Sequence, residues 1–222
     1  MLINNLKSIN EQIISCIESN NREINEVKLI GVSKKKPIEM IMEAFDAGLK
    51  DFGENYVEEF VSKQIKYHPA GLNYHFIGRL PTKKVRKIVG KAELIHSVDS
   101  LKLASKIDFV ASEEKVSQEI LIQLNQGGES SKSGIEAIEI ENLFKAILKL
   151  SNIKIKGLMS IPPFGENAKD YFIELREIRD FLEIKFDINL PFLSMGMSSD
   201  FKEAIEEGAT HIRVGTSIFG SR

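Results

Sequence analysis

Apolar residues in the first part of the chain recur with a helical period. Leu2, Leu6, Ile9, Ile13 and Ile17 follow one another at intervals of three or four residues and form one stripe along a helix. We expect this stripe to pack on the rest of the protein rather than on a second copy, because most amphipathic helices cover their own core.

After this helix the pattern changes to short β-branched runs separated by amphipathic stretches. Pro37 suits the first position of a helix, and Gly48 and Gly208 suit the position after a helix end. The runs that read as strands are residues 28–33, 51–55, 74–78, 94–99, 119–125, 155–161, 191–196 and 211–216.

Strands that alternate with helices, without two-residue hairpin turns between them, predict parallel β/α units. The simplest α/β arrangement of eight such units is a single (β/α)8 barrel of the TIM type, here with an additional N-terminal helix. An open doubly wound sheet is the alternative. A length of 222 residues suits one such domain over residues 1–222, and two small domains are the competing interpretation.

Composition and charge narrow the class of protein. The formal net charge is -2, so there is no electrostatic reason to expect a nucleic acid or an anionic membrane as partner. No stretch approaches the roughly 18 apolar residues of a membrane span. The single Cys16 cannot form an internal disulfide, and no secretory signal opens the chain. We therefore expect a cytoplasmic protein.

In a barrel of this type the functional side chains gather at the carboxyl ends of the strands. No strand end offers an obvious Ser, His and acid triad, and the histidines lack the spacing of metal ligands, so we expect no metal site. The residues at the expected strand ends are Ser33, Lys34, Glu54, Asn55, Gly78, Ser97, Asp99, Asn125, Ser160, Met195, Gly196, Gly215 and Thr216.

Three consecutive lysines follow the first expected strand, in the run IGVSKKKP. Side chains on a strand alternate, so Ile30, Val32 and Lys34 share one face. If Ile30 and Val32 fill the barrel, Lys34 enters its mouth, whereas Lys35 points to the helix layer or to solvent. A lysine in a partly desolvated pocket beside other cations has a lowered pKa, and its neutral amine attacks aldehydes. The alternative is that all three are solvated surface charges.

A second candidate site lies near the C-terminus. Ser198 and Ser199 lead into the short helix DFKEAIEEG, in which Asp200 and Glu203 occupy capping-box positions. Backbone N–H groups at a helix start, beside these hydroxyls and a Gly-Thr pair at residues 215–216, predict an anion cradle. In (β/α)8 barrels, the loops after strands seven and eight are the usual phosphate site. The alternative is that the glycines only form turns.

The lysine and the cradle face each other across a small barrel mouth. This arrangement suits pyridoxal 5'-phosphate (PLP), whose aldehyde and phosphate lie on opposite sides of one ring. Arg213 lies two residues before Gly215 on the same strand face and could reach the ring nitrogen. A guanidinium, which stays charged, would keep that nitrogen unprotonated and make the ring a poor electron sink.

With these features the sequence resembles the pyridoxal phosphate homeostasis protein family (the YggS or PROSC family), which has an alanine-racemase-like barrel of fold type III. The matching stretches run in order over nearly the whole chain: GVSKKKP, AGLKDFGENYVEE, YHFIGRLPTKKVRKI, IQLNQGGESSKSGI, IKGLMSIPP and LSMGMSSDFKEAIEEGATHIRVGTSIFGSR.

The resemblance implies that Lys34 forms a Schiff base with PLP and that the protein buffers this cofactor for PLP-dependent apo-enzymes, with no established catalytic turnover. The residues that it implies as further cofactor contacts are Ser198, Gly215 and Thr216 at the phosphate, and Asn55, His75, Met195 and Arg213 at the ring or pocket.

This chain departs from the family pattern at three positions. Tyr74 stands where the family has Phe or Trp, and Pro81 and Lys83 stand where it has Gln and Asn. The expected pocket is unchanged, and we assign no role to the loop 81–84 or to Lys132, which matches a family lysine.

Two enzymatic functions are the alternatives to a non-catalytic carrier. One is a small PLP-dependent amino-acid racemase, and the other is a sugar-phosphate barrel enzyme with Lys34 as its Schiff-base nucleophile. Racemisation needs acid–base groups on both ring faces, and the racemases that resemble this barrel take one from an added domain and a partner subunit. The sequence ends at Arg222, just after the eighth strand. We therefore expect no second domain, a carrier rather than an enzyme, and a monomer.

Overall fold

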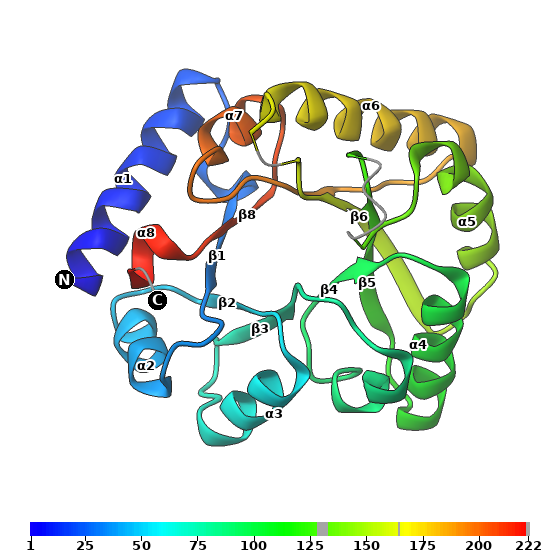
Figure 1. The fold of residues 1–222 in the computed structure, drawn as a ribbon, viewed down its shortest axis with the longest axis horizontal. Coiled ribbons are helices and arrows are strands. Elements are labelled where there is room, and N and C mark those ends of the chain that lie inside the picture. The colour runs from blue at the N-terminus through cyan, green and yellow to red at the C-terminus, as the bar shows by residue number, and fades with distance from the viewer. Residues whose placement is uncertain (128–132, 164, 221–222) are drawn as a thin grey trace.

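The computed structural model describes residues 1–127, 133–163 and 165–220, and its strands form one closed parallel barrel in the order β1 to β8 (Figure 1). Every predicted strand is present within one or two residues of its expected place, so the predicted barrel is confirmed. The strands are β1 (Lys28–Val32), β2 (Asp51–Glu54), β3 (Asn73–Phe76), β4 (Ile95–Val98), β5 (Gln118–Leu124), β6 (Ile153–Ser160), β7 (Phe192–Ser194) and β8 (His211–Val214).

Helices surround the barrel (Figure 1). They are α1 (Leu2–Ser19), α2 (Ile38–Asp46), α3 (Val57–Lys66), α4 (Leu101–Glu114), α5 (Ile140–Ile147), α6 (Ala168–Phe186), α7 (Phe201–Glu206) and α8 (Thr216–Phe219), with 3-10 helices η1 (Ile24–Glu26), η2 (Thr82–Lys87) and η3 (Ala137–Glu139). Within the described ranges, no helix is long and apolar enough to cross a membrane.

The connection from β3 to β4 differs from the alternating pattern, because it holds the 3-10 helix η2 and no α-helix. Pro81 precedes η2, and Gly90, with a φ of 72°, follows it closely. Pro37 also differs slightly from expectation, since it caps α2 rather than occupying its first turn.

The N-terminal helix α1 buries the predicted apolar stripe, whose five residues are each at most 6% exposed. The Nδ2 atom of Asn5 donates a hydrogen bond to the carbonyl oxygen of Ile218 at 3.2 Å, and α1 lies beside α8 (Figure 1). The prediction that this helix covers the protein's own core is confirmed.

Strand alternation determines which residues face the barrel interior. A Cβ atom on Gly31 would lie 2.5 Å from the side chain of Leu49, in the helix layer, so Gly31 faces outward. Its neighbours Ile30 and Val32 therefore face inward. This direction carries on to Lys34, which follows Val32 by two residues at the mouth of the barrel.

A bulge on β6 brings one glycine against the next strand. Ile155 pairs with Ile120, but Gly157 pairs with Leu121, so β6 has one extra residue. At Gly157 φ is 154°, and an added Cβ atom would lie 1.8 Å from the carbonyl oxygen of Phe192. Only glycine fits this approach of β6 to β7.

We predict that Gly157→Ala lowers the free energy of unfolding by about 2 to 4 kcal/mol, because the new methyl group collides with backbone on β7. The matched control is Gly71→Ala, where φ is 85° and nothing lies within 4 Å of the added atom. Backbone strain alone should cost about 1 kcal/mol there. Urea unfolding of both variants measures the difference, and equal losses would contradict the packing argument.

Candidate functional site

A cavity of about 380 Å³ opens at the carboxyl end of the barrel strands. It brings together residues at the carboxyl ends of β1, β2, β3, β6, β7 and β8, as the strand-end argument predicts. The lining residues are Val32, Lys34, Asn55, Ile77, Ile161, Met197, Ser198, Ser199, Arg213, Gly215 and Thr216. Six of the eight predicted site residues are among them.

The three consecutive lysines have three different environments. Lys34 lines the cavity. Lys35 has a left-handed backbone with φ of 59°, its N–H donates to the carboxylate of Glu59, and its Nζ lies 5.8 Å from the centre of the Tyr56 ring. The Nζ of Lys36 donates to the carbonyl oxygens of residues 219 and 220, at 3.0 Å each. The predicted distinction between Lys34 and its neighbours is confirmed in geometry.

A buried ion pair lies directly behind Lys34. The Nζ of Lys63 on α3 is 2.7 Å from Oε1 of Glu54 and donates to the carbonyl oxygen of Ser33, also at 2.7 Å. The hydroxyl of Ser33 donates to the same carboxylate oxygen at 2.6 Å. Glu54 and Ser33 are fully buried, and Lys63 is 6% exposed. This clamp holds the peptide unit that leads into Lys34.

Burial has a large effect on the acid of this clamp. Desolvation raises the pKa of Glu54 to about 7, although the positive charge and hydrogen bond of Lys63 and the hydrogen bond of Ser33 act in the opposite direction. The Glu54 carboxyl therefore gains a proton far more readily than an exposed glutamate does.

The predicted cradle residues meet at one edge of the cavity. The Oγ of Ser198 accepts hydrogen bonds from the N–H of Gly215 at 3.4 Å and from the hydroxyl of Thr216 at 3.2 Å. The predicted capping box is wrong, because Asp200 makes no side-chain cap to α7. Its Oδ1 instead accepts from the N–H of Met197 at 2.6 Å, so the carboxylate binds the loop before α7 rather than the start of the helix.

Arg213 brings a buried positive charge to the cavity. It is 4% exposed, and its Nη1 and Nη2 donate to the Ser194 hydroxyl at 2.7 Å and to the Ser160 carbonyl at 2.8 Å. Burial lowers its pKa to about 10, so the guanidinium stays charged near neutral pH. Neither of these two partners carries a negative charge.

The lining of the cavity fits an anion. Two cationic side chains and a group of hydroxyls lie around it, and among the described lining residues there is no carboxylate. The Oδ1 atom of Asn55 is buried without a hydrogen-bond partner in the described structure. A phosphorylated aldehyde with a heteroaromatic ring would supply negative charge, an electrophile for Lys34 and polar atoms for Asn55 and Arg213.

Two predicted site residues, His75 and Met195, do not line this cavity. His75 lies inside the barrel beneath it and is hydrogen-bonded to Asp51 and His96. Met195 is fully buried in the main hydrophobic core. The interior cluster of His75, His96 and His211 was not predicted, because these residues lie on three strands that come together only when the barrel closes. Lys132 lies outside the described residues.

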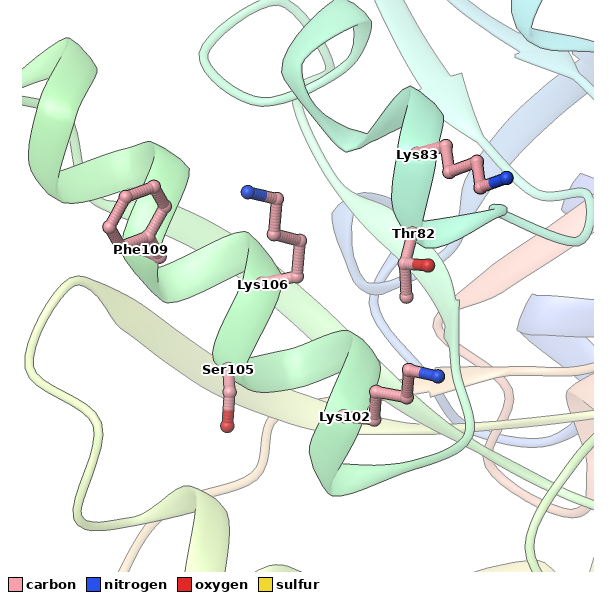
Figure 2. A pocket seen from close by; sticks show the side chains of 6 residues that line it. All are labelled: Thr82, Lys83, Lys102, Ser105, Lys106 and Phe109. Atoms are coloured by element: carbon pink, nitrogen blue, oxygen red, sulfur yellow. The ribbon is translucent and has the colours of Figure 1, made fainter.

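A separate groove lies outside the barrel between η2 and α4. Figure 2 shows Lys83, Lys102 and Lys106 around it, with the Nζ of Lys106 4.6 Å from the centre of the Phe109 ring. None of the predicted site residues contributes to this groove. In the part of the chain that the structure describes, no group of His, Cys, Asp or Glu side chains could hold a metal ion.

Comparison with known proteins identifies the class first. Residues 14–222 match the family described as alanine racemase, N-terminal domain. An alanine racemase from Corynebacterium glutamicum has the same fold, with a TM-score of 0.77 at 15% identity over 100% of this chain and 61% of that chain. The barrel with its lysine at the first strand is thus of the alanine racemase type.

Closer relatives define the family within that class. The chain is 46% identical over 220 residues to the pyridoxal phosphate homeostasis protein of Aquifex aeolicus, covering 98% of this chain and 96% of the relative. It is 35% identical over 226 residues to the protein of the same name from Escherichia coli, covering 100% and 97%. The protein belongs to the pyridoxal phosphate homeostasis protein family.

A solved structure extends the comparison. PipY of Synechococcus elongatus, solved with PLP bound, has a TM-score of 0.88 and 35% identity, over 99% of this chain and 100% of that chain. The fold match therefore covers the whole of PipY, a protein that was solved with PLP, the cofactor that the sequence of the present chain suggests.

We predict that the buried Glu54 makes stability depend on pH. The folded pKa of about 7 lies above the ordinary 4.5, so the folded state binds the proton more tightly. Its contribution to stability is complete below pH 4.5 and is lost as the pH rises through 7. Between about pH 4 and about pH 8, the free energy of unfolding should fall by about 3 kcal/mol relative to Glu54→Gln.

Denaturant unfolding of the protein and of Glu54→Gln across this range measures the difference. Contributions from all other groups cancel in that comparison when the variant keeps the fold. Parallel pH profiles, or a difference that grows with rising pH in favour of the glutamate, would show that the clamp does not hold a proton.

Proposed function

We propose that this protein binds PLP in the cavity at the mouth of the barrel and acts in cofactor homeostasis as a carrier, without catalytic turnover. One observation supports this most strongly: Lys34 and Arg213 line the same cavity as the hydrogen-bonded group of Ser198, Gly215 and Thr216. The described lining of this cavity has no carboxylate. Family membership and the PLP-bound PipY structure support the same ligand.

In this proposal six of the lining residues have a defined task. The amine of Lys34 would bond to the aldehyde carbon of PLP with loss of water, and this cofactor supplies a reactive carbonyl when bound. Ser198, Gly215 and Thr216 would hold the phosphate. Arg213 would face the ring nitrogen, with Asn55 beside the ring. We assign no direct contact to His75 or Met195, because neither lines the cavity.

The composition of the cavity favours a carrier over a racemase. Racemisation requires a proton donor and a proton acceptor on opposite faces of the ring. Lys34 and Arg213 are the titratable groups among the described lining residues, and an arginine that keeps its proton is a poor general base. The PLP-dependent apo-enzymes of the cell would be the recipients of the cofactor, and the carrier would act as a monomer.

We predict that the purified protein with PLP absorbs at about 420 nm through the covalent link to Lys34, and that Lys34→Ala abolishes this band. Lys35→Ala is the matched control, because Lys35 lies outside the cavity and contacts Tyr56. The spectra of the three proteins after PLP addition and gel filtration decide the question. A yellow Lys34→Ala protein would assign the link to another amine.

A second prediction separates the carrier from an enzyme. The PLP-loaded protein, incubated with each L-amino acid in deuterated water, should exchange the α-hydrogen no faster than free PLP does. Proton NMR of the α position follows the exchange. Steady exchange at about 1 per second or faster would be an enzymatic rate and would refute the carrier proposal.

A further inference from the structure

A chain of hydrogen bonds crosses the barrel interior and ends on the arginine of the cavity. It runs from Arg213 on β8 through Ser194 on β7, His96 on β4 and His75 on β3 to Asp51 at the start of β2. The donor–acceptor distances along it are 2.7, 2.8, 3.0 and 2.9 Å. All five residues are buried.

We propose that Asp51, His75, His96 and Ser194 are positioning residues that orient the guanidinium of Arg213 toward the cofactor from the opposite end of the barrel. This inference rests on the proposed function only in its last step, the contact between Arg213 and PLP. The remaining steps concern protons and hydrogen bonds within the protein itself.

With neutral histidines, the two ends of the chain fix the direction of every hydrogen bond. A guanidinium can only donate and a carboxylate can only accept. Arg213 therefore donates to Ser194, whose hydroxyl donates to Nδ1 of His96. The Nε2–H of His96 donates to Nδ1 of His75, and the Nε2–H of His75 donates to Asp51. In this order each donated proton has an acceptor within the chain.

The reverse order at the histidines is less favourable. If His96 carried its proton on Nδ1, the Ser194 oxygen would accept from both His96 and Arg213. The hydroxyl proton of Ser194 would then have no acceptor among the described residues, at a buried position where such a loss is costly. The geometry thus selects the Nε2–H tautomer of both histidines.

Burial and neighbouring charges support neutral imidazole at the centre of the chain. Desolvation and the nearby His75, His211 and Arg213 hold the pKa of His96 well below its ordinary value. At the far end, burial opposes ionisation of Asp51, but the hydrogen bonds from His75 and Asn73 and the charge of Lys28 act in the opposite direction and lower its pKa to about 2. A neutral His96 therefore lies between the carboxylate end and the guanidinium end of the chain.

Groups around Asp51 keep this end fixed in place. The Nζ of Lys28 lies 3.2 Å from its Oδ1, and the amide of Asn73 donates to the same oxygen at 3.1 Å. The ring of His211 packs against His75 with ring centres 6.1 Å apart, but it is not a member of the chain. Side chains from the two neighbouring strands, Lys28 on β1 and Asn73 on β3, thus hold Asp51 while it accepts from His75.

The first test reads the tautomers in the protein without cofactor. Nitrogen-15 NMR of histidine-labelled protein should show both His75 and His96 protonated at Nε2 near neutral pH. In Asp51→Asn, whose amide can donate as well as accept, part of His75 should carry its proton on Nδ1, whereas Asp51→Glu should keep the original form. A proton on Nδ1 of His96, or tautomers unchanged in Asp51→Asn, would overturn the proposal.

The second test measures the effect at the cavity. Ser194→Ala removes the link between His96 and Arg213, and it should weaken PLP binding about tenfold, the usual loss for a hydrogen bond to a charged group. Thr210→Val is the matched control, because it also removes a hydroxyl bonded to a barrel histidine, the 2.9 Å contact with Nδ1 of His211, outside the chain. It should change the affinity by less than about twofold.

Titration of each apo-protein with PLP gives the dissociation constants. Unchanged binding in Ser194→Ala, or an equal loss in Thr210→Val, would overturn the positioning role. If the unsubstituted protein itself fails to bind PLP, the proposed function is wrong, and the NMR test still decides whether Asp51 orders the protons of the chain.

Discussion

The hydrogen bond from the Lys63 ammonium to the carbonyl oxygen of Ser33 is the contact on which the geometry of the site depends. It fixes the peptide unit before Lys34, while Glu54 receives both the Lys63 ammonium and the Ser33 hydroxyl. A buried ion pair of this kind contributes little net stability, but loss of one partner costs about 3 to 5 kcal/mol. The clamp instead sets the direction in which the Lys34 side chain leaves the backbone, because the hydrogen bond from Lys63 restrains the preceding peptide unit.

The interior of the barrel is unusual for its polar content. Three histidines, an aspartate and an arginine lie among the strands where apolar layers commonly fill such a barrel. Each charge is spread over several hydrogen bonds, so the cost of burial is offset by a connected network rather than by one contact. The hydrogen-bond partners of Arg213 in that network are neutral. An anionic ligand in the cavity would therefore supply the negative charge that the buried guanidinium lacks.

Much of this architecture could be predicted from the sequence. The barrel strands are buried on both faces and therefore read as β-branched runs, and strand alternation from Ile30 placed Lys34 at the mouth. Met195, which the family resemblance implied as a pocket contact, does not line the cavity, and on β7 it is Ser194 that faces inward, where its hydroxyl accepts from Arg213. When a strand is apolar on both faces, or nearly so, its sequence does not show which residues face the barrel interior and which face the helices.

Other features of the site depend on contacts that a sequence does not show. Glu54 and Lys63 belong to a strand and a helix that meet only in the folded protein. His75, His96 and His211 lie on β3, β4 and β8, and only barrel closure brings β8 near β3 and β4. The position of His75, two residues before the inward Ile77, was the available signal for its place in the interior.

The most direct test of the account is to locate the covalent attachment of PLP. Borohydride reduction of the PLP-loaded protein makes the link permanent, and mass spectrometry of its peptides then reports the modified residue. We predict the pyridoxyl group on Lys34 in the peptide that contains residues 30–37, with Lys35 and Lys36 unmodified. A modification found on either neighbour, or on a lysine elsewhere in the chain, would contradict the assignment of the cavity.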